Sequence, residues 1–315
     1  MSRPTARTAK ALSFILLLLL LSALMVAAAF IGTAQSTEFV IVHLRIPRIV
    51  MSVFAGASLA LCGAIFQSVF RNPVCDPYIL GISSGASIGA ALAFILGLDF
   101  YLFGVTAFAL TTAFLTLLLM LGIARFSKIK STYIMLLAGI SLNFLMASIL
   151  TLLMVLNHQE MQKIIFWTMG SFSTVSYYDI MFFIPIFMVC LFFTFLLSKD
   201  LNLMQLGDAQ AQSLGVNTQR VLYAVLFLSS VLIAATVSIC GVIGFIGLII
   251  PHLARIVWGN NTKNLFTFSM LLGAIFMLVA DTLARVLVSN AELPVGSITA
   301  LVGAPYFIYM LVRKG

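Results

Sequence analysis

The sequence predicts an all-α membrane protein, and three observations lead to this fold class. Apolar residues make up 62% of the 315-residue chain, charged residues only 8%, and the mean hydropathy is +1.17. Soluble domains carry roughly 25% charged residues, so this composition places the chain in a bilayer. The apolar runs reach the length of about 20 residues that a spanning helix needs, and they lack the alternation of barrel strands.

We expect about ten transmembrane helices in a single domain that covers residues 1–315. The first run is Leu-rich and follows basic residues, as in a signal peptide. It is long enough to span and has no compelling cleavage site, so we interpret it as a retained helix. A short additional helix is expected at 160–172, around Trp167. The expected spans are 11–31, 47–69, 82–98, 101–124, 132–156, 179–198, 220–240, 242–258, 265–289 and 297–312.

The positions of Lys and Arg predict the orientation of the bundle. With a cytoplasmic N-terminus, 13 of the 17 cations fall on the cytoplasmic side, in agreement with the positive-inside rule. Both termini are then cytoplasmic. The rule disfavours the remaining cations, which would lie outside: Arg45, Arg48, Lys163 and Arg285.

A polar segment of about twenty residues, 199–219, interrupts the apolar runs and must lie in water. Its pattern predicts two short helical pieces that are separated at Gly207 and end at Gly215. A connection this long and this organised is usually functional, so we interpret it as a docking surface in preference to an ordinary solvated loop.

The connection after the second span has a different character. Pro73, Pro77, Gly81 and Gly85 follow one another closely and interrupt any helix there. We expect this irregular backbone to be partly embedded in the protein interior, where neighbouring groups satisfy it.

Several classes of membrane protein are disfavoured. The spans carry no acidic runs or regularly spaced arginines, which argues against a proton pump or a voltage sensor. No P-loop sequence is present, and Cys62, Cys75, Cys190 and Cys240 follow no metal-binding spacing. We expect no catalytic residue, metal or cofactor in this chain. A transporter of this kind needs energy from elsewhere, and the polar segment is a suitable place to receive it.

Six motifs occur in order, and together they resemble the FecCD/BtuC-like permease family of ABC importers for iron–siderophores, haem and vitamin B12. The resemblance begins near Leu44 and continues to the C-terminus. The motifs are LRIPRIV (44–50), GASLALCGAIFQSVFRNPVCDPYILGISSGAS (56–87), LGDAQAQSLGV (206–216), GVIGFIGLIIPHLAR (241–255), ADTLAR (280–285) and ELPVGSITALVGAPYF (292–307).

The resemblance implies a BtuC-like fold with both termini in the cytoplasm, and it implies partners. Two copies of the permease would form a homodimer around a central pathway in the cytoplasmic membrane of a bacterium or archaeon. Two cytoplasmic ATPase subunits, which bind ATP and Mg²⁺, would dock below. A periplasmic or lipid-anchored binding protein would dock above and deliver the cargo.

The resemblance also implies roles for particular residues, each with a simpler alternative. The ATPase-coupling residues would be Leu206, Gly207, Asp208, Ala209, Ala211, Leu214 and Gly215, and the alternative is a solvated loop. Arg45, Arg48 and Arg285 would dock acidic residues of the binding protein; the alternative is headgroup anchoring with an ion pair between Asp281 and Arg285. The cytoplasmic gates would be Asn72, Val74, Ser131 and Thr132, of which the last two are also plausible helix caps. Pathway candidates are Ser141, Asn143, Ser148, Trp167, Ser171 and Ser297.

His252 follows Pro251, and we interpret it as a structural hydrogen bonder at a kink in preference to a haem ligand. The leading function is a permease for an iron chelate, and the same machinery carrying cobalamin or an oxyanion such as molybdate is the alternative. An ion-coupled carrier would need buried charge pairs at mid-membrane, and a structural scaffold would not need the polar segment.

Overall fold

The computed structural model describes residues 6–32, 37–101, 103–126, 132–288 and 291–314, and these residues form helices joined by short connections, with no strand among them. The short helices are η1 (Val40–Arg45), η2 (Pro77–Leu80), η3 (Leu98–Phe100), α6 (Met161–Thr168), α8 (Ser198–Met204) and α9 (Asp208–Ser213). The long helices are α1 (Ala6–Phe30), α2 (Ile46–Val69), α3 (Ile82–Ile95), α4 (Gly104–Phe126), α5 (Thr132–Leu156), α7 (Tyr177–Leu196), α10 (Thr218–Cys240), α11 (Ile246–Trp258), α12 (Thr262–Val286) and α13 (Val295–Lys314).

The long helices of the described residues match the ten predicted spans one to one. Seven of them are long and apolar enough to cross a membrane, whereas α3, α11 and α13 are shorter apolar helices. The short α6 confirms the additional helix around Trp167, and α8 and α9 confirm the two pieces of the polar segment. Helix α1 starts five residues earlier than predicted, and α11 starts four residues later. The late start of α11 has a physical cause, because Gly241 and Phe245 both have φ of +70° and no regular helix continues through them.

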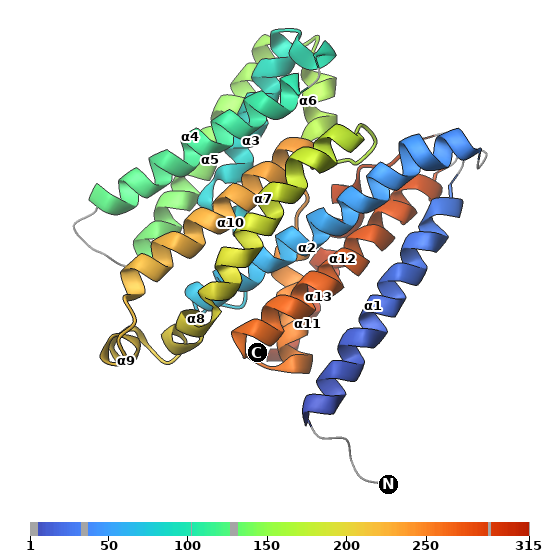
Figure 1. Ribbon diagram of the computed structural model, residues 1–315. Helices are drawn as coiled ribbons and strands as arrows, with labels where there is room; N and C mark the ends of the chain where they lie inside the picture. The colour runs from blue at the N-terminus through green and yellow to red at the C-terminus, as the bar shows by residue number, and fades with distance from the viewer. Residues whose placement is uncertain (1–5, 33–36, 102, 127–131, 289–290, 315) are drawn as a thin grey trace.

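The bundle has two distinct ends (Figure 1). We call the end that holds α8 and α9 the α9 end, and the opposite end, which holds α6 and the start of α2, the α6 end. The chain enters α1 and leaves α13 at the α9 end. The predicted placement of both termini on one side of the bundle therefore agrees with the arrangement of these helices.

Helix α2 is the centre of the bundle, and α1 lies at its edge (Figure 1). In the most apolar part of each helix, 83% of the residues of η1–α2 are buried, against 6% of those of α1. The difference has a simple cause: α2 packs against α10, α11 and α12, whereas α1 contacts mainly α12. The exposed leucines of α1 are suited to lipid.

Glycines allow the helices around α2 to approach closely. A Cβ atom added to Gly56 would lie 2.5 Å from Cβ of Met277 and closer still to the backbone of Gly273, and one added to Gly273 would lie 2.5 Å from Cβ of Ala60. Small residues at such crossings bring the backbones into van der Waals contact, which is the main source of helix association in a membrane. Gly63 and Gly247 make a second crossing of this kind, between α2 and α11.

The connection between α2 and α3 is embedded in the protein interior, as predicted. Cys75, Pro77 and Leu80 are buried, and Pro77 packs against Gly247. The hydroxyl of Tyr78 donates a hydrogen bond to the carbonyl oxygen of Ile243 at 3.0 Å, and the backbone N–H of Ile243 contacts the same hydroxyl at 3.3 Å. The two irregular segments, 70–81 and 241–245, therefore satisfy part of each other's backbone.

We expect Gly56→Ala to destabilise the protein by about 1–3 kcal/mol or more, because the added methyl group must push α2 and α12 apart. Gly122→Ala on α4 is the matched control, since nothing lies within 4 Å of its added Cβ. Thermal unfolding of the purified protein in detergent measures the difference. Equal melting temperatures for the two variants would contradict the close α2–α12 contact.

Candidate functional site

A buried ion pair joins α2 to α12 at the α6 end. The guanidinium Nε of Arg48 donates to both carboxylate oxygens of Asp281, at 2.8 and 3.1 Å. Asp281 is fully buried and Arg48 is 6% exposed. Removing two charges from water is costly, and only close pairing with several hydrogen bonds offsets that cost. The pair therefore fixes the relative position of the two helices.

The other two arginines of this region bind the C-terminal end of α1. Arg45 donates to the carbonyl oxygen of Ala29 at 2.9 Å, and Arg285 donates to that of Ala28 at 3.3 Å. The last carbonyl groups of a helix have no partner within the helix, and cations at that end also interact favourably with its dipole. These contacts hold the end of a helix that has little buried surface of its own.

Docking through free arginine side chains requires exposed guanidinium groups, and the structure contradicts this for all three docking candidates. Arg45, Arg48 and Arg285 are 5%, 6% and 5% exposed, so their side chains do not project freely toward a partner. The alternative ion pair is confirmed, since Nε of Arg285 lies 3.4 Å from Asp281. The sequence indicated the pairing of Arg285 with Asp281, but it gave no sign that Asp281 and Glu292 face Arg48 from 233 and 244 residues away.

Glu292 is the accessible member of this charge cluster. Its carboxylate accepts a hydrogen bond from Nη1 of Arg48 at 2.7 Å, and its side chain is 50% exposed. Arg48 thus has one carboxylate partner in the interior, Asp281, and a second partner that water reaches. Glu292 was not among the predicted site residues; its position two residues before Pro294 in the last motif was the available signal.

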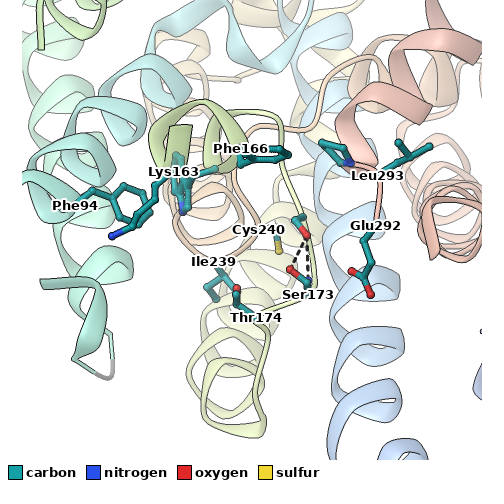
Figure 2. A pocket seen from close by; sticks show the side chains of 12 residues that line it. Phe94, Lys163, Phe166, Ser173, Thr174, Ile239, Cys240, Glu292 and Leu293 are labelled. Atoms are coloured by element: carbon teal, nitrogen blue, oxygen red, sulfur yellow. Dashed lines mark hydrogen bonds between the residues drawn. The ribbon is translucent and has the colours of Figure 1, made fainter. Parts of the chain in front are cut away.

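A cavity of about 330 Å³ lies beside this cluster at the α6 end (Figure 2). Its walls are aromatic and polar, and Lys163 and Glu292 lie on opposite sides of it. Lys163 contacts Glu160 at 2.9 Å and Asp99 at 3.0 Å. These two carboxylates raise the pKa of Lys163 above its ordinary value, so it stays charged and its charge is already paired. The lining comprises Phe94, Lys163, Phe166, Trp167, Ser171, Ser173, Thr174, Ile239, Cys240, Glu292, Leu293 and Pro294.

Three segments meet at the floor of the cavity through their backbones. Ser171 N–H donates to the carbonyl of Cys240 at 2.9 Å, and Val295 N–H donates to that of Gly170 at 3.0 Å. Gly170 and Gly241 have φ of +73° and +70°, and a Cβ on Gly241 would lie 2.9 Å from Cα of Gly170. Glycine is needed here both for the left-handed conformation and for the close approach.

The pathway candidates separate into two groups in the structure. Trp167 and Ser171 line the cavity. Asn143 instead holds the embedded connection: it donates to the carbonyls of Tyr78 and Ile79, at 3.1 and 3.3 Å, and accepts from Ser84 at 2.6 Å. The hydroxyls of Ser141 and Ser148 lie on an exposed face of α5 and bond to carbonyls one turn earlier, and Ser297 lies near the start of α13.

The α8–α9 segment presents an apolar surface at the α9 end. Leu206 and Leu214 are 63% and 60% exposed, and Ala209 is exposed between them. Gly207 and Gly215, with φ of +122° and +88°, set the turns that flank α9. Ala211 differs from the other predicted coupling residues because it is fully buried against the bundle and cannot touch a partner.

Polar contacts join this segment to the rest of the chain. Asp208 forms an ion pair with Arg71, next to the predicted gate residues. Asn202 on α8 accepts hydrogen bonds from the backbone N–H and the hydroxyl of Thr262 at the start of α12, at 2.8 and 2.6 Å. The sequence gave no indication of these pairs, because 60 residues or more separate the partners.

The gate candidates are only partly described. Asn72 accepts a hydrogen bond from the backbone N–H of Val74 at 3.0 Å, which closes a tight turn after α2 and leaves Val74 exposed. Ser131 lies outside the described residues. Helix α5 begins at Thr132, whose side chain is not described. Near this turn, burial raises the pKa of Asp76 to about 6, and the backbone N–H of Tyr78 offsets part of the shift.

His252 and the four cysteines lie in the interior. His252 is 3% exposed on α11, one residue after Pro251, and Cys62, Cys75, Cys190 and Cys240 are buried with free thiols. This placement agrees with their interpretation as packing and structural residues.

We expect Asp281→Ala to destabilise the protein by about 3–5 kcal/mol, because it leaves two buried guanidinium groups without their carboxylate. Asp99→Ala is the control, since its partner Lys163 is half-exposed and should lose little. Thermal unfolding in detergent, followed by size-exclusion chromatography, compares the two. A similar small loss in both variants would show that the buried pair does not hold α2 and α12 together.

Comparisons with known proteins agree with this architecture. The FecCD transport family pattern matches residues 10–313. The molybdate import permease MolB of Haemophilus influenzae is 39% identical over 88% of this chain and 82% of its own. The hemin transport permease HmuU of Yersinia pestis is 37% identical over 86% of this chain and 83% of its own.

A solved structure supports the same assignment. The inward-facing conformation of a metal-chelate type ABC transporter superposes with a TM-score of 0.88 at 36% identity, over 95% of this chain and 98% of that one. Family, relatives and fold identify a transporter subunit and not a catalytic enzyme. The chain belongs to the FecCD transport family and is the permease of an ABC importer, a multi-pass protein of the cytoplasmic membrane.

Proposed function

We propose that this permease moves an iron chelate, a siderophore or haem, across the cytoplasmic membrane, driven by ATP hydrolysis in a separate subunit. The cavity at the α6 end carries the proposal. Its walls include Phe94, Phe166 and Trp167, which suit the flat apolar surfaces of an organic ligand. Hydroxyl groups from the 171–174 loop provide weak polar contacts, as a pathway that must release its cargo requires.

The same lining disfavours an oxyanion. A molybdate-sized anion would need unpaired cations or a row of backbone N–H donors. Lys163, the cation of the cavity wall, already contacts two carboxylates, and Glu292 adds a negative charge on the other side. Cobalamin is also a large organic chelate, and it is the alternative cargo that fits the same walls.

The α9 end supports a docking role for α8–α9. Exposed leucines beside a turn that needs glycine form a compact apolar surface, which fits a groove on an ATPase subunit that binds ATP and Mg²⁺. The cation distribution of the sequence favours a cytoplasmic location for this end. We further propose that two copies of the chain assemble around the pathway, with Asn72, Val74, Ser131 and Thr132 at its cytoplasmic gate.

The α6 end then faces the binding protein. The proposed docking residues are still Arg45, Arg48 and Arg285, but the way in which they meet the partner differs from simple surface contact. Their guanidinium groups are buried, so a partner carboxylate would have to enter the cluster and not merely touch an exposed side chain. Of the two carboxylates that bind Arg48, only Glu292 is accessible enough to be replaced.

We expect the double change Leu206→Ser plus Leu214→Ser to weaken co-purification of the ATPase subunit at least tenfold, because it removes two exposed apolar contacts. Val257→Ser is the matched control: Val257 is an equally exposed apolar residue, at the end of α11 and outside the α8–α9 segment. Quantitative pull-down from membranes that express both subunits measures the effect. Full ATPase retention in the double variant would rule out this surface.

Transport assays test the cargo. Proteoliposomes that contain the permease, its ATPase and its binding protein should accumulate ⁵⁵Fe–siderophore or haem when ATP is enclosed on the ATPase side. Trp167→Ala, which removes an aromatic wall of the cavity, should slow that uptake severalfold while subunit assembly persists. Uptake of molybdate or cobalamin in place of any iron chelate would overturn the cargo assignment and leave the importer assignment intact.

A further inference from the structure

A short strap of chain, residues 292–296, connects the arginine cluster to the segment that follows α6. Glu292 binds Arg48 at 2.7 Å, and Leu293 N–H donates to the carbonyl of Ala284 at 3.1 Å. Farther along, Val295 N–H donates to Gly170 and Gly296 N–H donates to Met169, at 3.0 and 3.1 Å. The strap thus holds α2 and α12 at one end and the end of α6 at the other.

Glu292 has the properties of an exchangeable partner. Asp281 is fully buried, contacts two arginines and bonds Nε of Arg48 with both oxygens, so no incoming group can replace it without opening the core. Glu292 contacts Arg48 through Nη1, and half of its side chain is exposed. Any carboxylate that approaches Arg48 from outside meets Glu292 first.

Release of Glu292 from Arg48 would also affect the cavity, because of where Glu292 lies. Its side chain lines the cavity, on the side opposite Lys163 (Figure 2). Two residues later, Pro294 lines the same cavity, and the next two residues carry the hydrogen bonds to the α6 segment. A displaced Glu292 would therefore alter the charge at the cavity wall and loosen the strap that fixes the end of α6.

We propose that Glu292 is a positioning residue: it occupies Arg48 while no partner is bound and yields it to a carboxylate of the docking protein, which releases the strap beside the cavity. This proposal rests on the proposed function, because it needs a docking partner at the α6 end. The proposal makes Glu292 a competitor for Arg48 within the chain itself. Removing this competitor should strengthen docking of the binding protein.

Glu292→Gln is the informative variant. A glutamine of the same shape loses the charge-assisted bond to Arg48, so the arginine becomes available. The binding protein of the importer, labelled and titrated against the permease in nanodiscs, should then bind the variant roughly tenfold more tightly than it binds the wild type. If Glu292 had only a structural role, the variant would bind the binding protein less tightly, because a loosened α6 end would fit a rigid partner less well.

Matched controls separate this effect from a general change in charge. Glu160→Gln removes one negative charge from the wall near Lys163 without touching Arg48, and should leave docking unchanged. Glu292→Asp keeps the charge but shortens the side chain, and should give an intermediate affinity. Unchanged or weaker docking for Glu292→Gln, or equal tightening by Glu160→Gln, would overturn the proposal.

A second readout needs no partner. Cys240 lines the cavity and is 1% exposed, so its labelling by N-ethylmaleimide reports how open the cavity is. The parent for this experiment has Cys62, Cys75 and Cys190 replaced by alanine, so that Cys240 is the thiol that reacts. Adding Glu292→Gln to this parent should make the labelling of Cys240 several times faster. The binding protein should accelerate labelling of the parent more than that of the variant. Equal labelling rates in parent and variant would exclude the strap mechanism.

The experiments distinguish failure of the proposed importer function from failure of the positioning role of Glu292. If the binding protein does not bind the wild-type permease at all, the proposed function fails. If it binds, but the Glu292→Gln change alters neither its affinity nor the labelling rate of Cys240, the importer function holds and the positioning role of Glu292 is wrong.

Discussion

The close contact between α2 and α12 is the constraint on which the other features depend. It has two parts of different character. In the middle of the helices, Gly56 and Gly273 bring the backbones together without any polar contact. At the α6 end, Arg48 and Asp281 fix the register, because a buried ion pair tolerates little displacement. The glycine contact gives close packing along the two helices, and the ion pair fixes a single alignment of one helix against the other.

The α2–α12 pair connects the two ends of the molecule. At the α9 end, Thr262 joins the start of α12 to Asn202 on α8, and Gln205 adds a contact to the same hydroxyl at 3.2 Å. At the α6 end, Asp281 joins α12 to the arginine cluster and through Glu292 to the cavity. A helix of 25 residues with polar clamps at both ends is a suitable element for rigid-body coupling between α8–α9 and the cavity.

The sequence was sufficient for the helices and for the local turns, but not for the charge cluster. Apolar length, glycines and prolines are local signals, so the spans, the short helix around Trp167 and the embedded connection could be predicted from them. The environment of Arg48 depends on Asp281, which lies 233 residues away, and no local pattern distinguishes a buried arginine from an exposed one at a helix start. The same limitation applies to Ala211 and Asn143: the sequence of a helix shows which residues are small or polar, and the packing of that helix decides which of them face inward.

The polar side chains of α2 differ in whether they bond within the helix or to a neighbouring helix. The buried hydroxyls of Ser58 and Ser68 bond to carbonyls of their own helix one turn earlier, so these two do not tie it to a neighbour. The strong interhelical bonds lie near the ends, at Arg48 and at Thr262. Apolar and glycine contacts permit small sliding movements, whereas charged contacts resist displacement until a competing partner replaces them. Gln67 of α2 is a further tie, because its Nε2 donates to the carbonyls of Leu248 and Gly247 on α11 at 2.8 and 3.3 Å. The accessible carboxylate of Glu292 is the point at which an outside partner can enter this arrangement.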